Sequence, residues 1–144
     1  MRIVLQRVTS ASVKVDGEII GKIGTGFLLL FGVGHDDTED DCRRLADKII
    51  GLRIFSDEND KINLDLANVG GSLLVVPQFT LYADCRKGNR PNFIQAAKPE
   101  KANELYEYFI EYLRSNGQNV QTGSFGADMK VELLNDGPFT VILE

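Results

Sequence analysis

The chain has 144 residues, of which 43% are hydrophobic, and a net charge of −5. This length predicts one domain, residues 1–144, with a hydrophobic core of its own. The negative charge argues against a protein that coats DNA or RNA, because broad phosphate contact requires a basic face. No apolar run approaches the ~20 residues that a membrane-spanning helix needs, so no membrane association is expected.

The first residues and the cysteines indicate a cellular setting. Met1-Arg2 leads directly into strand-like sequence, so no signal peptide is expected. The two cysteines, Cys42 and Cys85, lie outside any Cys-x-x-Cys pattern, and His35 is the one histidine. These residues predict no zinc cluster within one chain. We therefore expect a cytoplasmic protein that needs neither a metal nor a cofactor.

The first third of the chain predicts strands followed by a helix. Residues 2–9 and 11–15 alternate in a strand-like manner, and Asp16-Gly17 predicts a hairpin because both turn positions favour positive φ. The apolar run 27–31 predicts a central strand. We interpret His35 as an exposed loop residue rather than a catalytic base. Thr38 then opens a helix in a capping-box pattern. Its buried face is formed by Cys42, Leu45, Ala46 and Ile49.

The rest of the chain predicts a second helix among further strands. Residues 73–76 are four aliphatic residues, typical of a strand buried on both faces. Pro99 suits the first turn of a helix, and Asn116-Gly117 suits its end. Later strands are predicted over 120–124, 129–134 and 139–143. The hairpins and short connections favour an α+β fold with a mainly antiparallel sheet.

One predicted strand ends in an unusual way. The aliphatic run meets Pro77, which has no N–H and is tolerated only at an edge, a strand end or a bulge. An amide (Gln78), an aromatic ring (Phe79) and a hydroxyl (Thr80) follow directly. A strand that leaves a core and presents polar groups at an irregularity is a candidate site. The alternative is that Thr80 is present only because threonine is a good β-former.

Two motifs resemble those of the D-aminoacyl-tRNA deacylases. Residues 77–81, Pro-Gln-Phe-Thr-Leu, are similar to the family's Ser-Gln-Phe-Thr-Leu. Residues 135–140, Asn-Asp-Gly-Pro-Phe-Thr, are similar to its Asn-Asp-Gly-Pro-Val-Thr. Further blocks that resemble the family are residues 1–8, 82–88 and 125–129. Pro77 replaces the usual serine, so any role of that hydroxyl does not carry over.

The resemblance implies both a fold and an activity. The fold is a curved, barrel-like sheet that carries two helices, built as a homodimer. The activity is hydrolysis of the ester that joins a D-amino acid to the 3′ end of tRNA, which releases free tRNA and the D-amino acid. The partner is thus the aminoacyl-tRNA 3′ end. Exclusion of L-amino acids makes this a chiral proofreading step, and glycyl-tRNA mischarged on tRNA(Ala) would also be cleaved.

The expected catalytic residues are Gln78, Phe79 and Thr80. The sequence offers no convincing base beside Thr80, and a hydroxyl nucleophile needs an adjacent activator. We therefore expect the backbone N–H groups of Phe79 and Thr80 to stabilise the developing negative charge, and Gln78 to hold the substrate. The ribose 2′-OH of the substrate, or water positioned by it, assists the chemistry, as the resemblance also implies.

The second motif is expected to read chirality. In the family, the pair that corresponds to Gly137-Pro138 has a cis peptide bond and enters the partner subunit's pocket. Its carbonyls would fill the space that an L side chain needs, and glycine permits this close approach. From sequence alone, an ordinary turn is the alternative. Pro77, Arg7, Phe125 and Met129 are further candidates for supporting the site or contacting the terminal adenosine.

Other readings remain open from the sequence. The same fold could grip RNA ends or nucleotides without doing chemistry, or it could be a dimeric structural protein whose motifs serve only packing. The basic cluster of Arg86, Lys87 and Arg90 follows the first motif. It suits contact with a short single-stranded end, although a solvated loop would look the same.

Overall fold

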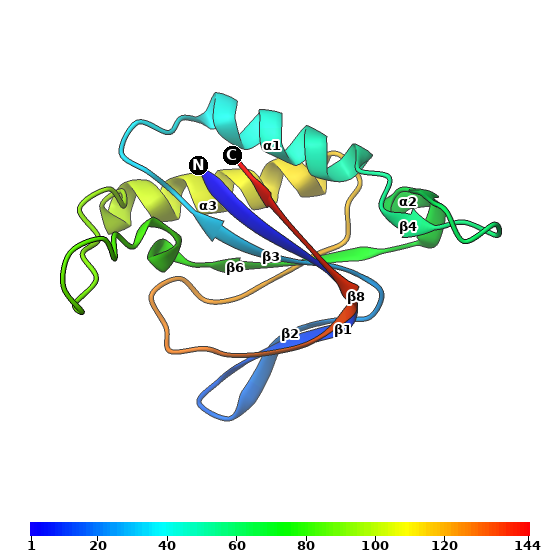
Figure 1. The fold of residues 1–144 in the computed structure, drawn as a ribbon, viewed down its shortest axis with the longest axis horizontal. Helices are drawn as coiled ribbons and strands as arrows, with labels where there is room; N and C mark the ends of the chain where they lie inside the picture. Colours follow the sequence, from blue (N-terminus) through cyan, green and yellow to red (C-terminus); the bar gives the residue numbers. More distant parts are fainter.

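A curved six-stranded sheet forms the framework of the protein, and the computed structural model describes residues 1–144 (Figure 1). Five strands lie in the order β2-β1-β3-β6-β7, and β8 also pairs with β1. Their bounds are β1 (Arg2–Val15), β2 (Glu18–Ile23), β3 (Gly26–Gly32), β6 (Ser72–Pro77), β7 (Val120–Thr122) and β8 (Lys130–Leu143). A separate two-stranded sheet consists of β4 (Phe55–Ser56) and β5 (Ile62–Leu64).

Three α-helices and one 3-10 helix complete the fold. They are α1 (Glu39–Gly51), α2 (Leu66–Val69), η1 (Phe79–Tyr82) and α3 (Pro99–Ser115). The expectation of two helices is therefore corrected to three, because four residues that start at Leu66 form a further short helix. Asp65 caps it by accepting a hydrogen bond from the Asn68 N–H, a contact between polar residues that the apolar periodicity did not reveal.

The sheet is mixed, which corrects the prediction of a mainly antiparallel one. β1 pairs antiparallel with β2, β3 and β8, but β3 with β6 and β6 with β7 are parallel. The chain passes through α1 between β3 and β6, and through α3 between β6 and β7. Each helical crossover returns the chain to the end of the sheet where the previous strand began, so the next strand runs parallel.

The sheet curls until its edges nearly meet, as the resemblance implied. Gly21 in β2 lies so close to β7 that a Cβ atom there would be 2.7 Å from the Thr122 carbonyl oxygen. Glycine is thus needed where the two ends of the curled sheet touch. The hairpin between β1 and β2 also forms as predicted, with positive φ at Asp16 (51°) and Gly17 (80°).

Helices α1 and α3 cover one face of the sheet, as Figure 1 shows. The predicted start of α1 is confirmed: the Thr38 N–H donates to the Asp41 carboxylate at 2.9 Å, and this bond lowers the pKa of Asp41. Cys42 is buried in the core, and desolvation raises the pKa of its thiol to about 12. In α3, the buried Tyr106 hydroxyl donates to the Val75 carbonyl of β6 at 2.7 Å, which fixes the helix against the strand.

The other predicted elements are recovered with shifted bounds. The two strands predicted over 129–134 and 139–143 are one long strand, β8, which begins one residue later, at Lys130. His35 is exposed in the loop before α1, as expected, and its ring hydrogen bonds with the Ile94 carbonyl oxygen. None of the helices combines the length and apolar character that crossing a membrane requires.

Removing the Phe109 ring is predicted to destabilise the fold strongly. Phe109 in α3 is fully buried, and its ring centroid lies 4.7 Å from that of Phe31 in β3. Phe109→Ala should lower the free energy of unfolding by about 3–5 kcal/mol, because it leaves a cavity between helix and sheet. Urea unfolding measures this loss. Glu107→Ala, an exposed change on the same helix, is the control and should stay within about 0.5 kcal/mol of the original. Equal effects of the two changes would contradict the packing described here.

Candidate active site

The hydrogen-bond ladders on the two sides of β6 end at different residues. Towards β7, the last bond runs from the Gly123 N–H to the Val75 carbonyl at 3.1 Å. Towards β3, the Gln78 N–H still donates to the Phe31 carbonyl at 2.8 Å. Because successive residues of a strand direct their hydrogen-bonding groups to alternate sides, the missing N–H of Pro77 falls on the β7 side. Proline is accommodated there because that ladder has already ended.

The chain then turns away from the sheet in η1. The first N–H bond of this turn runs from Leu81 to the Gln78 carbonyl at 3.2 Å, followed by Ala83 to Thr80 at 3.0 Å. The N–H groups of Phe79 and Thr80 precede the first bond, so the turn itself offers them no acceptor. Two adjacent free donors can stabilise an oxyanion. Thr80 lies in a turn and not in a strand, so its β propensity does not explain it.

The side chains at this turn form a short polar pair. The Gln78 amide donates a hydrogen bond to the Thr80 hydroxyl. Thr80 is exposed, and no histidine, carboxylate or lysine hydrogen bonds with its hydroxyl. The chemistry that this arrangement supports directly is stabilisation of negative charge by backbone N–H groups.

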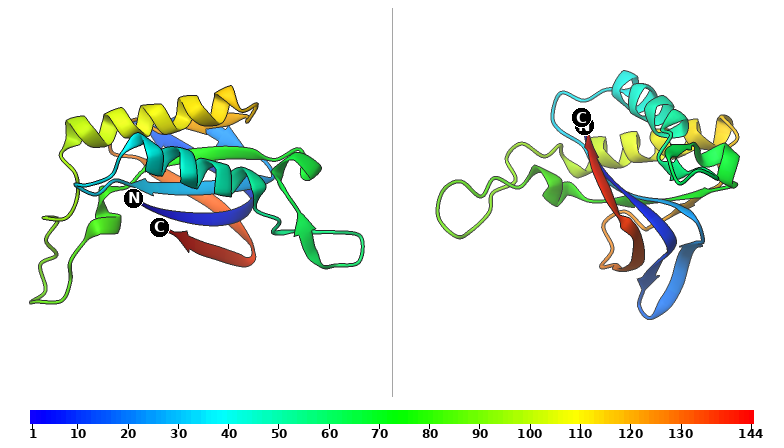
Figure 2. Two further views of the ribbon diagram at one scale, coloured as in Figure 1. Left: turned by 90° about the horizontal axis from the view of Figure 1, so that it is seen from above. Right: turned by 45° about the vertical axis from the view of Figure 1, so that its right-hand side comes forward.

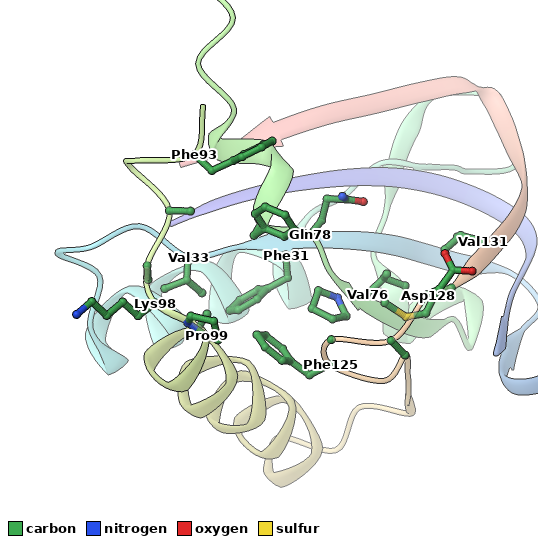
Figure 3. Close-up of a pocket in the computed structure, with 18 residues that line it drawn as sticks. Phe31, Val33, Val76, Gln78, Phe93, Lys98, Pro99, Phe125, Asp128 and Val131 are labelled. Atoms are coloured by element: carbon green, nitrogen blue, oxygen red, sulfur yellow. The ribbon is translucent and has the colours of Figure 1, made fainter. Parts of the chain in front are cut away.

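A cavity of about 670 Å³ lies beside η1. Figure 3 shows side chains from β6, from α3 and from the segment before β8 converging around it. Five of the residues singled out from the sequence line this cavity: Pro77, Gln78, Phe79, Phe125 and Met129. Most of the lining is apolar, with Gln78, Lys98 and Asp128 as its polar side chains. A mainly apolar cavity with a few polar groups is typical of a small-ligand site.

Aromatic rings line this cavity. Phe79 is 56% exposed, and its ring meets that of Phe93 edge to face, with centroids 5.0 Å apart. Phe125 packs against Tyr106 at a centroid distance of 6.1 Å. Exposed aromatic faces of this kind can stack on a base or on an aromatic side chain.

Sequence reasoning missed Phe93 and Gly123. Phe93 lies in the irregular segment before Pro99, and no periodicity marks it as part of a site. A Cβ atom at Gly123 would lie 2.6 Å from the Met129 sulfur and 3.5 Å from Pro77 Cδ. Glycine at this position therefore lets Met129 pack beside Pro77 in the cavity wall.

The second motif forms a bulge in β8. The β1–β8 ladder pairs Val8 with Asn135 and next pairs Gln6 with Thr140, so residues 136–139 have no regular partners. The Gly137-Pro138 peptide bond is cis, and Gly137 has φ 143°. A Cβ atom at Gly137 would be 2.9 Å from the Phe139 nitrogen, so only glycine fits this backbone.

Asn135 closes the bulge with both ends of its amide. Its Oδ1 accepts a hydrogen bond from the Phe139 N–H at 2.6 Å, and its Nδ2 donates to the Thr140 hydroxyl at 2.8 Å. One side chain thus ties the residues before and after Gly137-Pro138 together. The sequence showed Asn135 in the motif but did not reveal this role.

Arg7 holds the same bulge from β1. Its guanidinium donates to the carbonyls of Asp136 (2.9 Å) and Ile54 (2.6 Å), and lies 4.8 Å from the centroid of the Phe139 ring. The Arg7 side chain is only 12% exposed. Arg7 thus contacts the second motif and does not line the cavity.

The structure does not bring the two motifs together within one chain. Arg7, Thr80, Gly137 and Pro138 are not among the residues that line the cavity. Gly137 and Pro138 are instead exposed on the outside of β8. The same strand exposes large apolar side chains, with Leu134 at 62% and Ile142 at 63% exposure. No group of three or more His, Cys, Asp or Glu side chains is placed to hold a metal ion.

Loss of the Arg7 guanidinium is predicted to loosen the bulge. Arg7→Met keeps much of the side-chain volume but removes the donors to Asp136 and Ile54, at a cost of about 1.5–3 kcal/mol per charged hydrogen bond. Amide hydrogen exchange should become faster at Phe139, whose N–H donates to Asn135 Oδ1 within the bulge. Arg114→Met is the control, because Arg114 donates to the Val120 carbonyl at 2.9 Å, between α3 and β7, and has no hydrogen bond to the bulge. Unchanged exchange at Phe139 in Arg7→Met would show that Asn135 alone holds the bulge.

Comparisons with known proteins agree with the two motifs. The family model described as D-Tyr-tRNA(Tyr) deacylase matches residues 4–144. Proteins named D-aminoacyl-tRNA deacylase from Clostridium beijerinckii and Koribacter versatilis are 56% and 57% identical over 144 residues, which is 100% of this chain and 97% of each relative.

Solved structures extend the similarity to the fold. The c-Myc DNA unwinding element binding protein has a TM-score of 0.94 at 41% identity, over 100% of this chain and 98% of that one. A probable eukaryotic D-amino acid tRNA deacylase has a TM-score of 0.84 at 19% identity, over 99% of this chain and 97% of that one. At this low identity, the similarity is evidence for a shared fold only. The resemblance seen in the motifs is confirmed, and the chain belongs to the D-Tyr-tRNA(Tyr) deacylase family of ester hydrolases.

Proposed function

We propose that this protein hydrolyses the ester of D-aminoacyl-tRNAs and spares the L esters. The observation that carries this proposal is the pair of N–H donors, from Phe79 and Thr80, left free where η1 begins beside the cavity. Hydrolysis of an activated ester needs stabilisation of an oxyanion more than it needs a new covalent intermediate. Family membership supports the same substrate class.

In this mechanism the terminal adenosine enters the cavity and the ester carbonyl oxygen points at the two N–H groups. Water attacks the carbonyl carbon, the N–H groups stabilise the resulting oxyanion, and the bond to the tRNA 3′ oxygen breaks, with that oxygen taking up a proton. Gln78 holds the substrate. Phe125 and Met129 in the cavity wall provide contacts for the adenosine, whose base can stack on an aromatic ring. The 2′-OH of the terminal ribose assists the attacking water.

Chirality is read by Gly137-Pro138 of a second copy of the chain. This pair is exposed and lies outside the cavity of its own chain, so it acts only on a cavity that a partner brings to it. The exposed Leu134 and Ile142 on the same strand supply apolar area for such contact, which supports the expected homodimer. Asn135 and Arg7 hold the bulge rigid, and a rigid backbone wall excludes an L side chain without recognising a D side chain.

A protein of this kind acts on tRNA in the cytoplasm as a proofreading step of translation. The net charge of −5 and the small size of the cavity favour contact with one RNA end over broad contact with DNA. The lack of a base at Thr80 favours one competing function, binding of RNA ends without hydrolysis. The experiments below separate the two.

The first expected result is the pattern of cleaved substrates. Matched D-tyrosyl- and L-tyrosyl-tRNA should be cleaved and spared, respectively. Exclusion has nothing to exclude when the side chain is a hydrogen, so glycyl-tRNA, including glycyl-tRNA(Ala), should be cleaved while L-alanyl-tRNA is largely spared. Release of free tRNA measures each reaction. A protein that binds these tRNAs and leaves every ester intact would be the binding module and not a hydrolase.

Mixed dimers test whether Gly137-Pro138 acts across the interface. One chain carries Pro138→Ala together with a disabled 78–80 turn, and its partner is unaltered. The only working cavity then faces the altered bulge, so the mixed dimer should be as impaired on D-tyrosyl-tRNA as the Pro138→Ala homodimer. Normal D-specific activity would show that the pair acts within its own chain.

The Thr80 hydroxyl is predicted to be dispensable for most of the activity. Thr80→Ala keeps the backbone N–H, so turnover of D-tyrosyl-tRNA should remain substantial, whereas loss of a nucleophile would cost several orders of magnitude.

The 2′-OH of the substrate is predicted to matter more than the Thr80 hydroxyl. A D-tyrosyl-tRNA that ends in 2′-deoxyadenosine should bind nearly normally and be cleaved far more slowly. Collapse of activity in a folded Thr80→Ala protein, or unchanged cleavage of the deoxy substrate, would reject this mechanism.

A further inference from the structure

A basic loop projects from the molecule directly after η1. Asp84 and Asn92 form its base by exchanging two backbone hydrogen bonds, of 2.8 and 3.1 Å. Residues 85–91 between them are all exposed, and Figure 2 shows this part of the chain extending away from the sheet and helices. The segment reads Cys-Arg-Lys-Gly-Asn-Arg-Pro, so it carries three cations and no carboxylate in a chain whose net charge is −5.

The three cations of the loop have different partners. Arg86 turns back to the base of the loop, where Nε and Nη2 donate to the two Asp84 carboxylate oxygens at 2.9 and 2.8 Å. This pairing lowers the pKa of Asp84 to about 2. Lys87 and Arg90 take part in none of the chain's ion pairs or side-chain hydrogen bonds. Arg86 thus secures the loop, and the other two charges face solvent without an internal anion.

The loop is continuous with the cavity wall. Asn92 closes the loop, and the next residue, Phe93, lines the cavity and packs edge to face on Phe79 of η1. A polynucleotide whose last nucleotide occupies the cavity must lead its preceding nucleotides out past the surrounding wall. Leaving on the side of Phe79 and Phe93 brings its backbone phosphates to the basic loop.

We infer that residues 85–91 form a phosphate-binding arm for the acceptor end of tRNA, in which Lys87 and Arg90 contact backbone phosphates upstream of the terminal adenosine. This inference rests on the proposed function for the identity of the RNA. Phosphate contacts fix the position of a nucleic acid without reading its sequence, so the arm serves every tRNA alike. A localised arm also resolves how an acidic protein holds a polyanion: the attraction is concentrated at the one place where the strand leaves the cavity.

The salt dependence of tRNA binding tests the arm directly. The altered protein is Lys87→Gln/Arg90→Gln. The control is Lys48→Gln/Lys61→Gln, which removes the same charge from exposed sites in the last turn of α1 and in the β4–β5 turn, outside the loop and the cavity wall. Binding of unacylated tRNA is measured at several salt concentrations by fluorescence anisotropy. Because net charge changes equally, any difference between the two proteins reports position and not overall charge.

The altered arm should reduce the slope of log affinity against log salt by about 1.4–1.8, the value for two lost phosphate contacts. The altered arm should bind tRNA less tightly than the original protein. This difference in affinity should shrink by about 7- to 12-fold when the salt concentration is raised from 50 to 200 mM. The control slope should match that of the original protein. Lys87→Arg/Arg90→Lys should restore the slope, because the charges return. Equal slopes for the altered arm and the control would overturn the inference.

Cleavage kinetics give a second, independent readout. The altered arm should raise KM for D-tyrosyl-tRNA and leave kcat unchanged, while cleavage of a D-tyrosyl ester of adenosine alone, which has no upstream phosphates, stays normal. An equal loss on the adenosine ester would reject the arm. If the original protein cleaves neither ester but the salt slopes still differ as expected, the arm stands and the proposed hydrolysis falls.

Discussion

The hydrogen-bond ladder between β6 and β3 continues further along the chain than the ladder between β6 and β7, and this asymmetry creates the site. The bond from Gln78 to Phe31 keeps the end of the strand attached, while the β7 ladder has already stopped at Val75. The chain that leaves β6 therefore stays beside β3, where Gly32 lies against Gln78 and Leu81, and no longer pairs with β7. It turns into η1, and the first N–H groups of that turn are left without acceptors. The reactive feature is thus a consequence of backbone geometry and requires no unusual side chain.

A second irregularity gives the molecule its other functional element. The β1–β8 ladder is interrupted opposite Arg7, and the four residues left over form the bulge that contains Gly137-Pro138. Such a bulge would be mobile if its own backbone groups were unpaired. Asn135 pairs the Phe139 N–H and Arg7 pairs the Asp136 carbonyl, so the protruding segment is anchored at both of its ends. Both irregularities follow one principle: the sheet supplies a rigid frame, and the segments that leave its ladders do the chemistry.

Local patterns predicted local structure well. The Asp16-Gly17 hairpin, the start of α1 at Thr38 and the end of β6 at Pro77 follow from φ preferences, capping and the missing proline N–H, all of which depend on neighbouring residues. Strand direction was not predictable in the same way, because β3 and β6 are separated by about forty residues and are made parallel by α1. The length of the segment between β3 and β6 did not by itself distinguish a helical crossover from a hairpin connection.

The site shows the same limit. The motif at 77–81 marked the right segment, but its sequence is equally compatible with a strand at Thr80, which lies in the turn of η1. Phe93 and Gly123 carry no sequence signal, since their importance comes from what packs against them. The outward position of Gly137-Pro138 follows from the register of β8, which neither composition nor periodicity specifies.

The pairing of β1 with β8 joins residues from the two ends of the chain, with Ile3 opposite Leu143. This is among the longest loop closures that the sequence permits, and its entropic cost falls on the folding reaction. During synthesis β1 emerges more than one hundred residues before its β8 partner. Until then the long edge of β1 is an open template for any other strand, and such edges promote aggregation. The edge of β1 therefore needs protection until β8 has been synthesised and can pair with it.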